Sequence, residues 1–289
     1  MKRTVFLALA LFALMAVGVY AQTGTPGLAF TAINNDKEYS VAKGTVTSGE
    51  VVIPSSYNKL PVTEITLNAF NGTQITAVTI PNSVKTIGGN AFLDCKVLAK
   101  VTIGKGVTSI GAGAFARTGI TAVTIPDSVT SIGNNAFLDC AGLKSVTIWV
   151  DSSTLVSIGD GAFARTGITS LNIPDSVTSI GNNAFLDCAK LIRLSFYDSS
   201  TLASIGDGAF ARTGIELLYI PASVKTLGSN AFMLCQNLTT VIFEGSIPSS
   251  GFAANAFGGI GDIRDKYLAG GAEAYIREKG GTTWTIKPY

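Results

Sequence analysis

Apolar and polar residues alternate in short stretches that recur along most of the chain. In residues 143–148, LKSVTI, the apolar residues Leu143, Val146 and Ile148 can face a core while the polar residues between them face solvent. Alternation with a period near two is typical of a β-strand. One strand of this length cannot bury its apolar side alone, so the pattern predicts that successive copies stack around a shared core.

An Ala-Phe pair marks each copy, and consecutive pairs are 22 to 26 residues apart. Residues 125–148, IPDSVTSIGNNAFLDCAGLKSVTI, show the consensus, in which Pro126 suits the end of a strand and Gly133 suits a turn. The repeat predicts a solenoid with a parallel β-sheet on its concave face and short turns, 3-10 or helical segments on its convex side. We place about nine repeats of 22–26 residues in residues 51–257.

The first residues have the pattern of a secretory signal. Lys2 and Arg3 precede an uncharged apolar stretch over residues 5–17, and residues 19–21, VYA, fit a signal-peptidase site. The stretch is shorter than the roughly 20 residues that a membrane span needs. We therefore predict a signal peptide at 1–21, an exported chain and no transmembrane anchor after cleavage.

A stack of rungs exposes its core at both ends and needs caps. Residues 28–50 have the pattern of a strand pair that covers the first rung, so we assign an N-terminal cap to 22–50. Residues 258–289 break the period, and we assign them to a C-terminal cap. Within it, residues 262–276 look partly helical, and Trp284 and Ile286 can close the last rung.

The residue three positions after each of the first eight repeat phenylalanines alternates strictly between threonine and cysteine. Adjacent rungs lie about 4.8 Å apart, which puts successive cysteines roughly 10 Å apart. A disulfide needs Cα atoms within about 7 Å, and zinc needs converging ligands. We therefore expect buried turn thiols with a structural role. They are Cys95, Cys140, Cys188 and Cys235.

One position earlier, acidic and basic residues alternate in the same way. If the rungs stack in register, these side chains form a ladder of opposite charges along one edge, and each exposed pair contributes about 0.2–1 kcal/mol. We expect a structural ladder, with a binding stripe of mixed sign as the alternative. The six residues are Asp94, Arg117, Asp139, Arg165, Asp187 and Arg212.

Composition excludes several classes of chemistry. The chain has no histidine, which removes the commonest general base and metal ligand. Without Lys2 and Arg3 the basic residues number 21 − 2 = 19, equal to the 19 acidic ones, so nucleic acid is not an expected partner. No cofactor motif is present, and we predict no enzymatic activity. The one metal hypothesis is a weak calcium site at the loop acids Asp151 and Asp198.

Candidate binding residues stand where the repeats differ from one another. Two nearly identical segments, 113–160 and 161–207, diverge mainly on and after their strands, where GLKSVTIWVD becomes KLIRLSFYD. Most outward strand positions are small, and the exceptions are the aromatic and charged residues that protein interfaces favour. We predict a ligand-binding surface on the concave face and its adjoining loops. Its candidates are Trp149, Arg193, Tyr197, Glu216, Leu217 and Tyr219.

The repeat IPDSVTSIGNNAFLDCAGLKSVTI resembles that of BspA-like leucine-rich-repeat proteins. The resemblance covers roughly residues 51–257, and the segments VVIPSSYNKLPVTEI and KYLAGG also resemble the flanks of such proteins in host-associated bacteria. It implies an exported or surface protein that binds host matrix components, other proteins or other cells, and it carries no catalytic residues. We expect a surface antigen or adhesin. A periplasmic or secreted scaffold is the alternative, and a carbohydrate-active or metal-dependent enzyme is a third.

Overall fold

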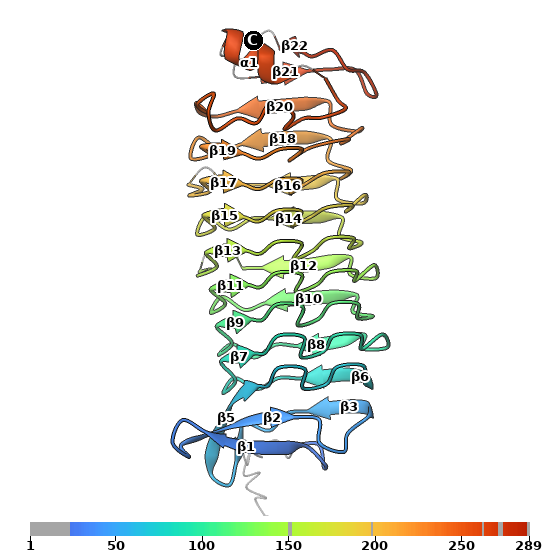
Figure 1. The fold of residues 1–289 in the computed structure, drawn as a ribbon, viewed down its shortest axis with the longest axis vertical. Helices are drawn as coiled ribbons and strands as arrows, with labels where there is room; N and C mark the ends of the chain where they lie inside the picture. The colour runs from blue at the N-terminus through green and yellow to red at the C-terminus, as the bar shows by residue number, and fades with distance from the viewer. Residues whose placement is uncertain (1–23, 150–151, 198, 262, 271–273, 288–289) are drawn as a thin grey trace, which may run out of the picture.

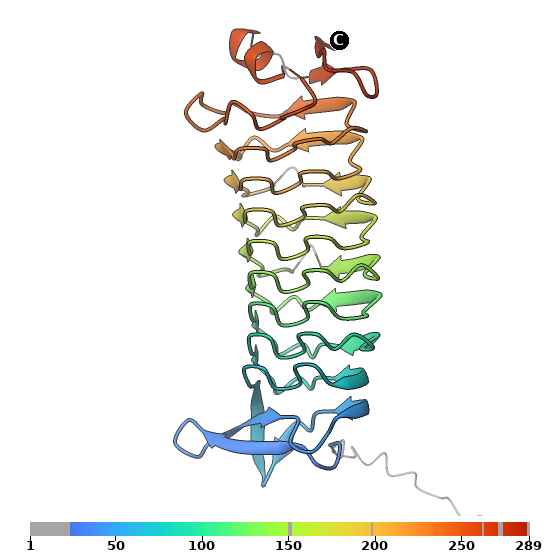
Figure 2. The ribbon, with the colours of Figure 1, turned by 45° about the vertical axis from the view of Figure 1, so that its right-hand side comes forward.

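The computed structural model describes residues 24–149, 152–197, 199–261, 263–270 and 274–287. The chain winds into a long, nearly straight column of stacked rungs, with β1 at one end and α1 at the other (Figures 1 and 2). Parallel strands pair from rung to rung, and α1 is the only α-helix among the described residues. The predicted leucine-rich-repeat type of parallel β-solenoid is confirmed.

Most rungs contribute two strands on different sides of the column. Figure 1 shows the shorter strands β7 to β19 in one row and the longer strands β6 to β20 in another. The short row is one continuous parallel ladder in which identical positions pair, such as Ser131 with Ser109 and Ile132 with Ile110. Each isoleucine of this row points inward and is buried. The sequence analysis predicted one strand per repeat, so this second row is a further feature.

The strands, most of them two to four residues long, and the helix α1 follow one another along the chain. Their bounds are β1 (Ala29–Ile33), β2 (Glu38–Ala42), β3 (Ser48–Val52), β4 (Ser56–Tyr57), β5 (Leu60–Ile65), β6 (Gln74–Thr79), β7 (Thr86–Ile87), β8 (Lys100–Thr102), β9 (Ser109–Ile110), β10 (Ala122–Ile125), β11 (Ser131–Ile132), β12 (Ser145–Ile148), β13 (Ser157–Ile158), β14 (Ser170–Asn172), β15 (Ser179–Ile180), β16 (Arg193–Ser195), β17 (Ser204–Ile205), β18 (Leu217–Ile220), β19 (Thr226–Leu227), β20 (Thr240–Phe243), α1 (Ile263–Gly270), β21 (Ala274–Ile276) and β22 (Thr285–Ile286).

A column of stacked phenylalanine rings runs through the core. From Phe70 to Phe257, nine rings follow one another with centroids 5.0–5.4 Å apart and planes within 17° of parallel. This spacing matches the rung repeat and is the offset stacking that aromatic rings prefer. The Ala-Phe pair therefore recurs because each rung supplies one ring to the same column.

The two ends are built differently. At the N-terminal end, β1 pairs antiparallel with β2, while β2 and β3 pair in parallel with β5 and β6, so the parallel ladder already begins inside residues 22–50. At the C-terminal end, β20 is followed by the antiparallel strands β21 and β22 and by α1. Over the described ranges, no helix is long and apolar enough to cross a membrane. The predicted signal peptide at 1–21 lies outside the described residues.

Candidate functional site

The outward side of the longer strands, β6, β8, β10, β12, β14, β16, β18 and β20, is here called the strand face. Its first half, here called the small-residue half, carries mostly small hydroxyl side chains. Examples are Thr79 and Thr102, or Thr124 and Thr147, which pair in register. Its second half carries larger side chains on β16 and β18. The two halves therefore offer different surfaces to a partner.

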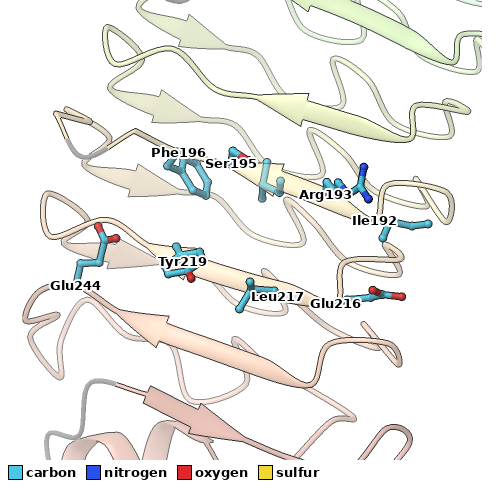
Figure 3. Close-up of a pocket in the computed structure, with 9 residues that line it drawn as sticks. Ile192, Arg193, Ser195, Phe196, Glu216, Leu217, Tyr219 and Glu244 are labelled. Carbon is cyan, nitrogen blue, oxygen red and sulfur yellow. The ribbon is translucent and has the colours of Figure 1, made fainter. Parts of the chain in front are cut away.

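A hollow of about 580 Å³ lies on this second half, over β16 and β18 (Figure 3). Four of the six predicted ligand-binding residues line it. Arg193 lies on β16, Leu217 and Tyr219 lie on β18, and Glu216 directly precedes β18. The structure thus brings together residues that are up to 26 positions apart in the sequence.

Strand alternation explains why these side chains point outward. Leu194 and Leu218 turn into the core and are buried, so their neighbours Arg193, Leu217 and Tyr219 must face solvent. Parallel pairing places Arg193 directly beside Leu217. Leu217 is 40% exposed and Tyr219 is 42% exposed, which makes them an apolar floor open to solvent. Exposed large apolar side chains that gather in one place commonly mark an interaction site.

Arg193 and Glu216 add two charges of opposite sign to the lining of the hollow. Within the described part of the chain, the side chains of Arg193 and Glu216 form no hydrogen bond or ion pair. Both are exposed and lie beside the apolar floor. The hollow therefore offers a cation, a carboxylate and apolar surface to one ligand.

Five further residues line the hollow, and the repeat comparison did not mark Ile192, Phe196 and Glu244 among them as candidates. Ile192 and Phe196 flank β16, and Glu244 follows β20 at the opposite end of the hollow from Glu216 (Figure 3). A signal for two of them was present, because Ile192 and Phe196 replace Lys144 and Ile148 of the duplicated segment. Glu244 gives no such signal, since it reaches the hollow only through the pairing of β18 with β20.

The other two predicted ligand-binding residues are not among those that line the hollow. Trp149 directly follows β12 and is 58% exposed, and Tyr197 lies two residues beyond β16 and is 37% exposed. Both stand where the longer strands end, at the edge of the strand face. Asp151 and Asp198, the two acids of the calcium hypothesis, lie outside the described residues. In the described ranges no group of three or more acidic or cysteine side chains is arranged to hold a metal ion.

The four cysteines are free and buried, and each contacts the threonine of the preceding rung. In the rungs of Phe115 and Phe137, the Thr118 hydroxyl donates to the Phe115 carbonyl at 2.9 Å, and the Cys140 thiol donates to the same oxygen at 3.1 Å. Burial raises the pKa of every one of these thiols, and that of Cys188 rises to about 11. The sulfur-to-hydroxyl distances are 3.3 Å for Thr73–Cys95 and 3.2 Å for Thr118–Cys140, Thr166–Cys188 and Thr213–Cys235.

The six alternating charges form three separate ion pairs on the surface. Each aspartate of a cysteine rung accepts two hydrogen bonds from the arginine of the next rung, as Asp139 does from Arg165 at 2.5 and 3.0 Å. The guanidinium group holds the pKa of each partner aspartate below its usual range. The pairs are Asp94–Arg117, Asp139–Arg165 and Asp187–Arg212.

These two kinds of contact complement each other along the column. A buried threonine–cysteine contact joins a threonine rung to the cysteine rung after it, and an exposed ion pair joins that cysteine rung to the next threonine rung. Every rung interface from Phe70 to Phe232 thus contains one of the two. The alternating residues therefore belong to the framework, and the strand-face hollow is the candidate functional site.

Comparison with known proteins agrees with this architecture. The family model described as "BspA type Leucine rich repeat region" matches residues 63–192 and 156–267, with 6 copies. Among curated proteins, none matches the chain.

The chain is also similar to solved structures of bacterial leucine-rich repeat proteins. A leucine-rich repeat protein from Bacteroides ovatus is 23% identical with a TM-score of 0.52, covering 78% of this chain and 71% of that one. The T. pallidum Leucine Rich Repeat protein is 22% identical with a TM-score of 0.50, covering 90% of this chain and 100% of that one. A leucine rich cell surface protein from Faecalibacterium prausnitzii is 24% identical with a TM-score of 0.45, covering 80% and 77%.

Proposed function

Because this chain belongs to the BspA-type leucine-rich repeat family, we propose that it is an exported bacterial protein-binding solenoid. In this proposal it is a surface antigen or adhesin that recognises host or other cell-surface proteins through the strand face. It acts without catalysis. The observation that supports the proposal most is the strand-face hollow, where exposed apolar side chains gather beside the charges of Arg193 and Glu216.

The partner surface is defined by the chemistry of the hollow. Leu217 and Tyr219 take an apolar side chain of the partner, and its burial supplies the main free energy of association. Arg193 takes a carboxylate and Glu216 takes an ammonium or guanidinium group beside that contact. Charges at the rim of an interface contribute more to the association rate and to specificity than to affinity. Trp149 and Tyr197 extend the contact along the edge of the face.

A binding screen tests the role of the hollow. Immobilised host matrix proteins are probed with the purified protein and with a Leu217→Ser/Tyr219→Ser variant. The control is a Ser145→Ala/Thr147→Ala variant, which changes the small-residue half of the same face. The proposal predicts that the first variant loses binding by at least about tenfold, since hot-spot side chains contribute 2 kcal/mol or more. The control keeps wild-type binding. Equal binding by all three proteins would reject the hollow as the site.

Protease treatment of whole cells tests the location. A surface protein is cleaved on intact cells. A chain that is protected until the envelope is opened would contradict the adhesin and would favour a periplasmic scaffold.

A further inference from the structure

The first and last strands of the column leave very different edges. The last strand, β22, has two residues and is followed by Lys287. The first strand, β1, has five residues, AFTAI, with no charge and no proline. Proteins normally protect an edge strand by making it short, charged or interrupted by proline, because its unpaired backbone groups can bind another strand. β1 has none of these protections.

The outer edge of β1 is free among the described residues. β1 pairs with β2 on one side only, with Phe30 opposite Val41 and Ala32 opposite Tyr39. In an antiparallel pair, alternate residues turn their N–H and C=O groups away from the partner strand. The outward groups of β1 therefore point past the end of the column, and no strand pairs with them among the described residues.

A second hollow, of about 460 Å³, adjoins this edge. Leu28, Phe30, Pro54 and Tyr57 supply its apolar lining. Phe30 and Tyr57 stack with ring centroids 4.1 Å apart, so the two rings form one continuous apolar surface. No charged residue lines the hollow. It suits an apolar side chain and disfavours a charged one, because an unpaired charge is costly to bury.

From this combination we propose a second binding site, at which β1 accepts an extended, uncharged segment of another protein by strand addition. Backbone hydrogen bonds to β1 hold the segment, and one apolar side chain on the Phe30 side enters the hollow. In strand addition, main-chain hydrogen bonds supply affinity and pockets for side chains supply specificity. This site lies at the N-terminal end of the column, far from the strand-face hollow (Figure 1).

A second copy of this chain fits the edge less well. β4 and β5 form an antiparallel hairpin whose turn is Asn58 and Lys59, and in both views this hairpin reaches past β1 at the end of the column (Figures 1 and 2). Two β1 strands that pair antiparallel across a two-fold axis would place both hairpins on the same face. Such a dimer would have to accommodate two hairpins at one junction, whereas a single added strand meets only one.

Peptide binding to the purified protein tests the proposal. The probe is a fluorescent, end-blocked heptapeptide, Ser-Thr-Val-Phe-Val-Thr-Ser. One comparison peptide is N-methylated at alternate backbone nitrogens, and another carries aspartate in place of phenylalanine. Saturable binding of the first peptide, with slowed amide exchange in residues 29–33, is the expected result. Both comparison peptides should bind at least about tenfold more weakly, as expected for lost hydrogen bonds or a buried charge.

Protein variants locate the same site independently. Ala32→Lys places a charge on the free edge, Tyr57→Ser opens the hollow, and Thr285→Lys is a matched control on the edge strand of the other end. We expect the first two variants to lose peptide binding and the control to keep it. Equal binding of the N-methylated peptide, or no saturable binding by wild type, would overturn the proposal. A concentration-dependent dimer that Ala32→Lys abolishes would also overturn it, because the edge would then serve a second copy.

Discussion

The Thr118 hydroxyl and the Cys140 thiol lie 3.2 Å apart on neighbouring rungs and share the Phe115 carbonyl as acceptor. A hydroxyl and a thiol are small enough to fill this turn, and each has a donor for a buried acceptor that would otherwise be unsatisfied. The cysteines are therefore kept apart by threonine rungs and held by hydrogen bonds.

This burial predicts that the thiols are unreactive in the folded protein. With a pKa of about 11, Cys188 is ionised in only about one molecule in a thousand at pH 8, and the thiolate is the reactive form. A thiol reagent should modify no cysteine rapidly in the native protein and all four in denaturant. Rapid modification of any of them without denaturant would contradict the buried position.

The same pKa shift predicts how stability depends on pH. The folded state keeps the thiols protonated, while the unfolded chain releases their protons near the ordinary value of 9.0. The unfolded state then binds fewer protons, so the free energy of unfolding falls as pH rises above 9. Urea titrations at pH 8 and pH 10 measure this fall. A variant with all four cysteines replaced by serine should lose most of it, and an unchanged fall would assign it to other groups.

The ion pair between Asp139 and Arg165 should contribute a small, pH-dependent coupling energy. A double-mutant cycle with Asp139→Asn and Arg165→Gln is expected to give about 0.2–1 kcal/mol at pH 7, because both side chains are largely exposed. The lowered pKa of Asp139 means that the coupling is present above 3.8 and is lost as pH falls further. A coupling that does not decrease on acidification below 3.8, or that is insensitive to salt, would contradict a surface ion pair.

The alternation of the rungs predicts how the thermal stabilities of two deletion variants compare. Deleting residues 115–136 removes one rung and places Asp94 beside Asp139 and Cys95 beside Cys140. Deleting residues 115–162 removes two rungs and restores the pairing of Asp94 with an arginine. In a plain solenoid the larger deletion is the less stable, since each rung interface adds to stability. We expect the larger deletion to lower the thermal midpoint by less than twice as much as the single-rung deletion, because only the latter brings two like charges together, at a cost of about 0.2–1 kcal/mol; a shift at least twice as large would show that the alternation has no energetic role.

Trp284 should determine the stability of the C-terminal end. Its ring is fully buried, its indole N–H donates to the Ile260 carbonyl at 2.8 Å, and the Arg277 guanidinium lies 5.3 Å from the ring centroid. Trp284→Ala is expected to cost about 3–5 kcal/mol and to speed amide exchange in β20 and β21. Trp284→Phe keeps the ring and should cost much less. Unchanged exchange in Trp284→Ala would show that the last rungs do not need this residue.

The fold could be predicted from the sequence because each rung repeats the same physical solution. The Ala-Phe interval measures one turn of the column, and the Thr118 and Cys140 positions show which rungs differ. The short strands, such as Ser131–Ile132, escaped prediction because two residues give no period. Their pairing follows from stacking and not from local sequence, since Ser131 and Ile132 form a strand through their pairing with the equivalent residues of the rungs on both sides.

The candidate site could be predicted in part. Arg193, Leu217 and Tyr219 stand out because they replace small residues at outward positions, which a comparison of repeats detects. That comparison does not give the hollow itself. The hollow depends on the lateral register of β16 and β18 and on Glu244, which reaches the hollow from the next rung. For the same reason the comparison of repeats does not separate Trp149, which lies on another rung, from the residues that line the hollow.

We propose that the strand-face hollow recognises a protein through Leu217, Tyr219, Arg193 and Glu216. The most direct measurement is the affinity of a matrix-protein partner for the wild type and for four variants. Arg193→Glu, Glu216→Arg and Tyr219→Ala change the hollow, and the control Thr124→Arg changes the small-residue half of the face. We predict that Tyr219→Ala weakens binding by at least about tenfold. Each charge reversal should slow association and reduce its dependence on salt, while the control leaves both unchanged. Equal affinities and association rates for all five proteins would contradict the claim.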